Sequence, residues 1–193
     1  MALPISRLDI VNQALTELGR LPVTNINDSE DATLLDVKLN LLLPVLLQET
    51  VWNFAILYRE DSTPLTTPLT PDFSYTYQLP ADYGRMFQFG NINNNLDTPY
   101  LISNNLISTN EKPISYYYII DDVNVDAIST MFFRAIVLFI ASDACLVLTE
   151  NEKLTQYLKA KYEEEKGKAV NLNDMERYIT TKPNNDYDRN IFV

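Results

Sequence analysis

Closely spaced carboxylates are the side chains of this sequence that could do chemistry, because carboxylates bind cations and transfer protons. Asp122, Asn124 and Asp126 match the first three ligand positions of an EF-hand calcium loop. The sixth position is Ala127 instead of glycine, and the twelfth is Phe133 where a bidentate glutamate is needed. The pattern therefore favours a helix-capping role for Asp126 over calcium binding.

Two pairs of neighbouring acids, Glu60-Asp61 and Asp121-Asp122, have the residue types of a glycosidase acid and base. Such an enzyme needs its two carboxylates to face each other across a cleft, and residues adjacent in sequence do not establish that geometry. Adjacent acids on a surface are more often solvated than catalytic. The pairs alone do not predict an enzyme.

The composition excludes several other kinds of site. The chain has no histidine, which removes the usual Ser-His-Asp triad and histidine metal ligands. Its one cysteine, Cys145, lies in an apolar run, so an internal disulfide is excluded. The 4 glycines, at positions 19, 84, 90 and 167, have no phosphate-loop or dinucleotide-binding spacing. We predict a protein without catalytic residues, metal or cofactor.

Tyrosine is the remaining residue type with a possible binding role. The chain has 12 tyrosines, with a run at Tyr116, Tyr117 and Tyr118. Aromatic side chains can stack on sugars or bases. Because side chains alternate along a strand, Tyr116 and Tyr118 should share one face and Tyr117 the other, so at least one of these faces is ordinary packing.

Length and charge limit the class of partner. A chain of 193 residues with 46% hydrophobic content fits one domain, with room for an insertion. Residues 151–193 hold 8 of the 15 basic side chains and 8 of the 26 acidic ones, so the whole net charge of −11 lies in residues 1–150. An acidic body repels phosphates, which argues against specific DNA binding but allows DNA to slide past without sticking.

Two helices are predicted before residue 53. Ser6 and Asp9 have capping-box spacing at the start of the first helix, which should end at Gly19. The second should run from residue 28 or 29 to Trp52, with Pro44 causing a kink or break near residue 40. Trp52 then marks the junction between helices and strands.

The middle of the chain has the pattern of short strands. They are expected at residues 55–59, 75–80, 86–89, 100–103, 106–109 and 114–120. The proline- and threonine-rich residues 62–71 should form a surface loop, and Asn104-Asn105 a tight hairpin turn. A small antiparallel sheet or barrel is therefore predicted.

Two more helices should follow. The third is expected from Asp126 to residue 148, and a second capping box at Thr149 and Glu152 should start the fourth. The third helix approaches membrane-span length, but Arg134 and Asp143 interrupt it, so we interpret it as a buried helix. The fourth should pack through one face, formed by Leu154, Tyr157, Leu158 and Tyr162.

These elements predict an α+β fold with three parts. Residues 1–52 and 124–174 should form a bundle of about four helices, and residues 53–123 an inserted β domain. Residues 175–193 should be an extended C-terminal arm, because their pattern becomes polar and turn-rich. The arm nevertheless carries apolar residues, so it either docks on a partner or packs back on its own domain; the docking candidates are Tyr187, Arg189, Ile191, Phe192 and Val193.

Three short motifs, in this order, resemble a known family. The sequence RLDIVNQAL at residues 7–15, with Leu18-Gly19 and Pro22-Val23 after it, is similar to the opening of the head-to-tail adaptor proteins of short-tailed bacteriophages, also called tail tubular protein A. The second motif matches that family's W-x-F-A element through Trp52, Phe54 and Ala55. The third resembles its Y-x-Y-x-L-P-x-D-x-x-R strand and turn through Tyr75, Tyr77, Leu79, Pro80, Asp82 and Arg85. The resemblance covers most of residues 5–170, whereas the Asn-rich middle hairpins depart from the family pattern.

The resemblance implies a non-enzymatic virion protein. Copies would form a dodecameric ring between the capsid portal and the tail, lining the conduit for DNA ejection. Its partners would be the portal protein, neighbouring copies of itself and the downstream tail or nozzle protein, with no membrane and no specific DNA contact. It would be assembled in the host cytoplasm and reside in the tail or neck of the virion. The alternative is a carbohydrate-binding tail module that uses the tyrosine-rich sheet.

Overall fold

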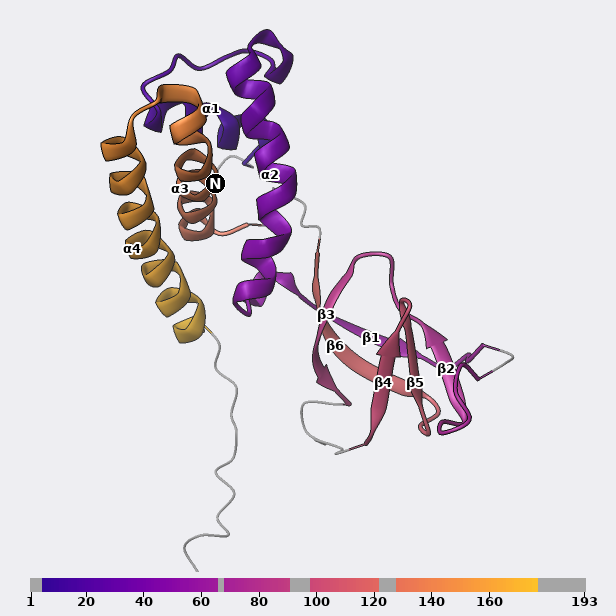
Figure 1. The fold of residues 1–193 in the computed structure, drawn as a ribbon. Helices are drawn as coiled ribbons and strands as arrows, with labels where there is room; N and C mark the ends of the chain where they lie inside the picture. The colour runs from indigo at the N-terminus through magenta and orange to yellow at the C-terminus, as the bar shows by residue number, and fades with distance from the viewer. Residues whose placement is uncertain (1–4, 66–67, 91–97, 122–127, 177–193) are drawn as a thin grey trace, which may run out of the picture.

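The computed structural model describes residues 5–65, 68–90, 98–121 and 128–176. Within these ranges the fold is α+β, with four α-helices and two three-stranded antiparallel sheets, and the described strands form no closed barrel. Figure 1 shows the helices gathered on one side of the molecule and the strands on the other. The helices are α1 (Arg7–Glu17), α2 (Glu30–Glu49), α3 (Thr130–Thr149) and α4 (Glu152–Glu176), with 3-10 turns η1 (Ile26–Asp28) and η2 (Asn53–Ala55).

Helix α1 begins as its sequence predicts. The Asp9 N–H donates to the Ser6 hydroxyl at 3.2 Å, and the Ser6 N–H donates to the Asp9 carboxylate at 2.8 Å. The Ser6 hydroxyl also donates to the Asp9 carboxylate at 2.6 Å, and the two bonds that this carboxylate accepts from Ser6 lower the pKa of Asp9, because they favour its charged form. The helix ends before Gly19, whose φ of 71° lies in the left-handed region that glycine adopts readily.

Helix α2 is continuous from Glu30 to Glu49, so the possible break near residue 40 does not occur. Pro44 removes one backbone donor, but α2 is held on both sides of it by leucines buried against the core. Ser29 caps the start by accepting from the Ala32 N–H at 3.0 Å. The buried positions are Ala32, Leu35, Leu39, Leu43, Leu46 and Leu47.

Helix α3 begins at Thr130, with Ser129 as its cap, so the start predicted at Asp126 is wrong. The Phe132 N–H donates to the Ser129 hydroxyl at 3.2 Å, and Asp126 itself lies outside the described residues. By length and composition α3 could span a membrane, yet 56% of its apolar window is buried within the protein. It packs against α1, α2 and α4, as the core helix of the bundle.

Helix α4 starts with a different cap from the predicted Thr149 and Glu152 box. Asn151 fills that role, since its side chain accepts from the Leu154 N–H at 3.0 Å. Of the predicted packing face, Leu158 and Tyr162 are buried and Leu154 is half-buried, whereas Tyr157 is 58% exposed. The helix continues to Glu176, so the first two residues of the predicted arm are helical.

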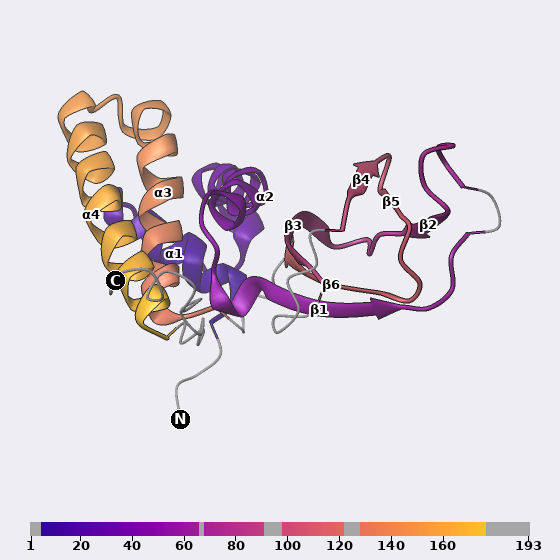
Figure 2. The ribbon, with the colours of Figure 1, turned by 90° about the horizontal axis from the view of Figure 1, so that it is seen from below.

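The strands form two separate sheets. One has the order β1-β6-β3, from β1 (Ile56–Asp61), β6 (Ile114–Ile120) and β3 (Tyr83–Phe89). The other has the order β2-β5-β4, from β2 (Tyr75–Gln78), β5 (Leu106–Thr109) and β4 (Tyr100–Ser103). The predicted Asn104-Asn105 turn is confirmed, because both residues have positive φ, 52° and 58°, between the paired strands β4 and β5. Figure 2 shows the first sheet lying nearer to the helices than the second.

Candidate functional site

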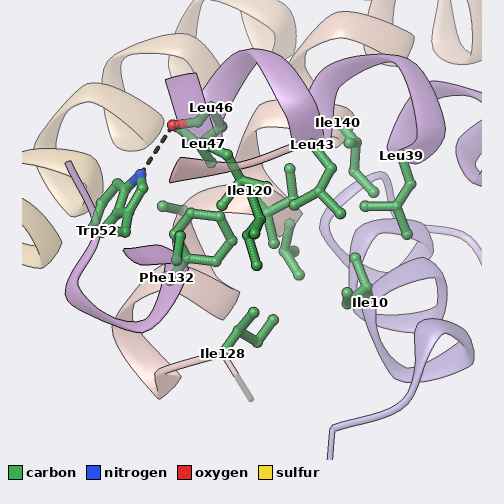
Figure 3. Close-up of a cluster of buried hydrophobic side chains, with 14 of the residues drawn as sticks. Ile10, Leu39, Leu43, Leu46, Leu47, Trp52, Ile120, Ile128, Phe132 and Ile140 are labelled. Atoms are coloured by element: carbon green, nitrogen blue, oxygen red, sulfur yellow. Dashed lines mark hydrogen bonds between the residues drawn. The ribbon is translucent and has the colours of Figure 1, made fainter. Parts of the chain in front are cut away.

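The W-x-F-A residues build the junction between helices and strands. Trp52 is 1% exposed, and its indole N–H donates to the Leu46 carbonyl at 2.9 Å, which satisfies one of the last carbonyls of α2. Phe132 of α3 packs edge-on against both Trp52 and Phe54, at ring-centroid distances of 4.9 and 5.0 Å. Figure 3 shows Trp52 and Phe132 among the leucines of α2. Ala55, in η2, is fully buried.

A hydrogen-bonded clasp joins the same junction to the end of α4. The Asn53 N–H donates to the Asn173 side-chain oxygen at 2.8 Å, and the Asn173 side-chain NH2 donates to the Val51 carbonyl at 2.8 Å. The Asn53 side chain completes the clasp by donating to the Asn173 carbonyl at 2.6 Å. Asn173 is only 7% exposed, so these bonds satisfy polar groups that water hardly reaches.

The Y-x-Y-x-L-P residues hold the second sheet together. Tyr77 is 1% exposed, and its hydroxyl donates to the Glu111 carbonyl at 3.1 Å. The Leu79 N–H donates to the Asn105 carbonyl at 3.0 Å, which ties β2 to the β4–β5 turn. Tyr75 is half-buried, with the Lys112 ammonium 5.6 Å from its ring centroid.

The rest of this motif forms the turn from β2 into β3. Pro80 is buried, and its carbonyl accepts from the Tyr83 N–H at 3.2 Å. Asp82 accepts a hydrogen bond from the Tyr118 hydroxyl at 3.2 Å, and its carbonyl accepts from the Asp121 N–H at 3.1 Å. Arg85 lies in β3, where its Nε is buried and has no hydrogen-bond partner among the described residues. These contacts position the backbone of the turn and the strands that it joins.

The tyrosine run divides between two faces, as alternation predicts. Tyr116 and Tyr118 are buried, while Tyr117 is half-buried beside Tyr58, with ring centroids 5.1 Å apart. Burial, together with the nearby Asp82 carboxylate, raises the pKa of Tyr118 to about 12. Burial also raises the pKa of Tyr116 strongly. Tyr58 is 49% exposed, so this outer face offers one well-exposed ring.

The acid pair at Glu60 and Asp61 does not face across a cleft. Glu60 accepts from the Tyr58 hydroxyl at 3.2 Å, whereas Asp61 pairs with Arg59 at 2.8 Å and accepts from the Tyr116 hydroxyl at 3.5 Å. Because consecutive residues of a strand alternate, these two carboxylates belong to opposite faces of the sheet. Asp122, Asn124 and Asp126 lie outside the described residues. Among the described residues, no group of three histidine, cysteine or acidic side chains is placed to hold a metal.

A row of exposed apolar side chains lies on α2. Val37, Leu41 and Val45 of α2 are 48%, 63% and 44% exposed. A groove of about 510 Å³ adjoins them at the start of α2, and Leu34 and Val37 are among its lining residues together with Asp28 and Glu30. A smaller cavity of about 260 Å³ lies between α1 and α3, with Gln13, Glu17 and Arg134 beside apolar side chains.

The docking residues predicted in the arm, Tyr187, Arg189, Ile191, Phe192 and Val193, lie outside the described residues. The sequence reasoning missed Asn173, although its spacing carried a signal. Asn173 lies four residues after buried Ala169, on the face of α4 that packs on the bundle. A polar residue at such a position indicates a buried hydrogen-bonding role.

The comparisons with known proteins add no relative: no protein-family model matches this chain, and no curated protein matches its sequence.

Proposed function

We propose that this chain is a structural adaptor of a short-tailed bacteriophage, forming a ring between the capsid portal and the tail. One observation carries the proposal: the residues that resemble the family motifs form two connected structural units. Trp52, Phe54 and Ala55 join helices to strands, while Tyr77, Leu79 and Asp82 organise the turn between the two sheets. Motif residues that act through packing and hydrogen bonds fit a non-enzymatic ring protein.

The division of the chain belongs to the same proposal. Residues 1–52 and 124–174 would form the helical domain, residues 53–123 the inserted β domain, and the residues beyond α4 an arm. The arm residues Tyr187, Arg189, Ile191, Phe192 and Val193 would dock on the portal or on a neighbouring copy. The ring would contain twelve copies and would pass DNA without binding it specifically, since the net charge of −11 repels phosphate.

Electron microscopy of the purified chain, alone and mixed with the portal ring from the same genome, tests the adaptor role. We expect a ring of this chain on one end of the portal, and its rotational symmetry gives the subunit number. A chain that stays monomeric beside a bare portal would contradict the proposal.

The role of the arm needs a separate variant. Deletion of residues 180–193 should weaken ring assembly or portal binding, because it removes all five docking candidates of the arm while leaving α4 complete. The full-length chain is the control, and circular dichroism of both chains should show the same helix content. Unchanged assembly and portal binding after the deletion would exclude the docking role.

The carbohydrate-binding tail module remains the second candidate, favoured by one observation. Tyr58, at 49% exposure, and its neighbour Tyr117 present aromatic rings on the outer face of the first sheet. A glycan screen should then find a ligand whose binding is lost in Tyr58→Ala and kept in Tyr157→Ala, an exposed tyrosine on α4. A screen without ligands would leave the adaptor as the single candidate.

A further inference from the structure

Helices α2 and α4 lie on opposite sides of the bundle, with α3 between them in both views (Figures 1 and 2). Each buries one face against its neighbours and leaves the other face outward. Figure 1 also shows that both helices start at the same end of the bundle and run in the same direction. In a ring whose rotation axis is parallel to these helices, α2 of one copy would therefore lie beside α4 of the next copy. The first turns of the two helices would then lie at the same height along the axis.

The outward face of α2 is apolar with an acidic end. Val37, Leu41 and Val45 lie four residues apart, so they form one stripe along the helix. Leu34 and Val37 also line the groove of about 510 Å³, and Glu30 lies one turn before Leu34 on the same side. Glu30 takes part in none of the ion pairs among the described residues. This face thus offers an apolar groove with an unpaired carboxylate beside it.

The outward face of α4 has the complementary chemistry. Tyr157 is 58% exposed, and Lys161 lies over its ring at 5.8 Å from the centroid. Lys153 lies one turn before Tyr157, is exposed, and is likewise in no ion pair within the described part of the chain. A lysine in the first turn of a helix is also unfavourable by itself, because the helix dipole is positive there. Lys153 therefore gains nothing from the dipole of α4, and its ammonium is free to pair with an acidic group of another chain.

We propose that α2 of one copy docks on α4 of the next, with Tyr157 in the α2 groove and Lys153 paired with Glu30. The spacing agrees on both helices, since Glu30 precedes Leu34 by four residues and Lys153 precedes Tyr157 by four. The contact joins two different faces, so it is heterologous, which is the kind of contact that a ring with more than two copies needs. The inference rests on the proposed ring and names the surfaces that would build it.

Charge reversal tests the pairing in the full chain mixed with the portal ring. Glu30→Lys and Lys153→Glu should each reduce the ring population, because each places like charges together at the contact. The double variant should restore the ring, because the pair is re-formed with its signs exchanged. Asp72→Lys is the matched control, since it makes the same charge change at an exposed position between β1 and β2 and should leave the ring intact. Single reversals without effect, or a double variant that is not rescued, would overturn the inference.

Disulfide trapping gives a second readout that does not depend on the portal. The variant carrying both Val37→Cys and Tyr157→Cys should form a ladder of covalent multimers on oxidation, whereas each single variant should stay monomeric. The native Cys145 is buried, so the unmodified chain is the background control. Dimers formed by Val37→Cys alone would show α2 facing α2 and would overturn the proposal.

The two readouts separate this inference from the proposed function. A ring on the portal without the α2–α4 ladder would overturn the inference and leave the adaptor role standing. A ladder together with a bare portal would support the docking of α2 on α4 and contradict the adaptor role.

Discussion

Gly84 lies where the fold leaves no room for a side chain, although nothing in its sequence context marks it. It lies at a register shift where β3 passes close to the end of β6. A Cβ at this position would be 2.9 Å from the Ile119 carbonyl oxygen, closer than real Cβ contacts, and 3.2 Å from the Asp121 nitrogen, which is also tight. Both atoms are backbone, so neither can move without disturbing the sheet.

Gly84→Ala should therefore lower the free energy of unfolding, by roughly 1–3 kcal/mol as for other overpacked sites. Urea denaturation followed by circular dichroism measures this free energy of unfolding. Gly167→Ala is the matched control, because a Cβ there meets nothing within 4 Å, and alanine in a helix should raise stability by about 0.5–1 kcal/mol. Equal effects of the two substitutions would contradict the close approach at Gly84.

The titration of Tyr118 in the first sheet makes the stability of the fold depend on pH. Its folded pKa of about 12 lies above the ordinary value of 10.0, because burial and the Asp82 carboxylate disfavour the phenolate. The stability from the neutral hydroxyl is therefore fully present below pH 10 and is lost as the pH rises from about 10 to about 12.

Tyr118→Phe should make the thermal midpoint less dependent on pH within this window, measured by thermal melts from pH 8 to pH 12. Tyr157→Phe, which alters an exposed ring, should keep the slope of the unmodified chain. A Tyr118→Phe profile identical to that of the unmodified chain would show that this hydroxyl does not titrate differently in the folded state.

At the scale of elements, the end of α4 is tied to the junction by Asn173. Asn173→Ala removes the partners of the Asn53 N–H and the Val51 carbonyl, both of which belong to half-buried residues. The loss of stability should be about 1–3 kcal/mol, the usual cost of unsatisfied buried groups. Hydrogen exchange should also quicken in the last turns of α4. Asn171→Ala changes an exposed residue of the same helix, and an equal effect there would exclude the clasp.

The elements also show what sequence patterns can and cannot predict. Strand alternation correctly divided Tyr116 and Tyr118 from Tyr117, and the left-handed preference of asparagine gave the turn at Asn104-Asn105. The cap predicted for α3, Asp126, is wrong, since Asp126 and Ser129 are both good caps and the choice between them depends on where packing against the bundle begins.

The interactions that connect distant segments could not be read from the sequence. Asn173 contacts Asn53, and Gly84 approaches Ile119, only because the chain folds back on itself. Local patterns carry helix periods and turn preferences, whereas contacts of this kind depend on the tertiary arrangement. The same reason applies to the outward faces of α2 and α4, because the sequence does not show that these two helices lie on opposite sides of the bundle.

For the whole molecule, charge gives a prediction about DNA. With a net charge of −11, the chain should show no rise in fluorescence anisotropy of labelled duplex DNA, even at low salt, where electrostatic binding is strongest. A basic protein of similar size is the positive control. Binding that weakens steeply with added salt would reveal a cationic surface that the proposed conduit should not have.

The burial of Trp52 also allows the junction between helices and strands to be followed by fluorescence. It is the sole tryptophan of the chain, so its emission comes from this one place. Its indole is enclosed by Phe132 and the end of α2, which should give a blue-shifted spectrum. If the strands tilt against the helices when the ring seats on a portal, water would reach the indole and shift its emission to the red. An unchanged spectrum would mean that the protein binds the portal as a rigid body. In either case the intrinsic fluorescence of Trp52 measures whether the junction changes on binding, without an added label.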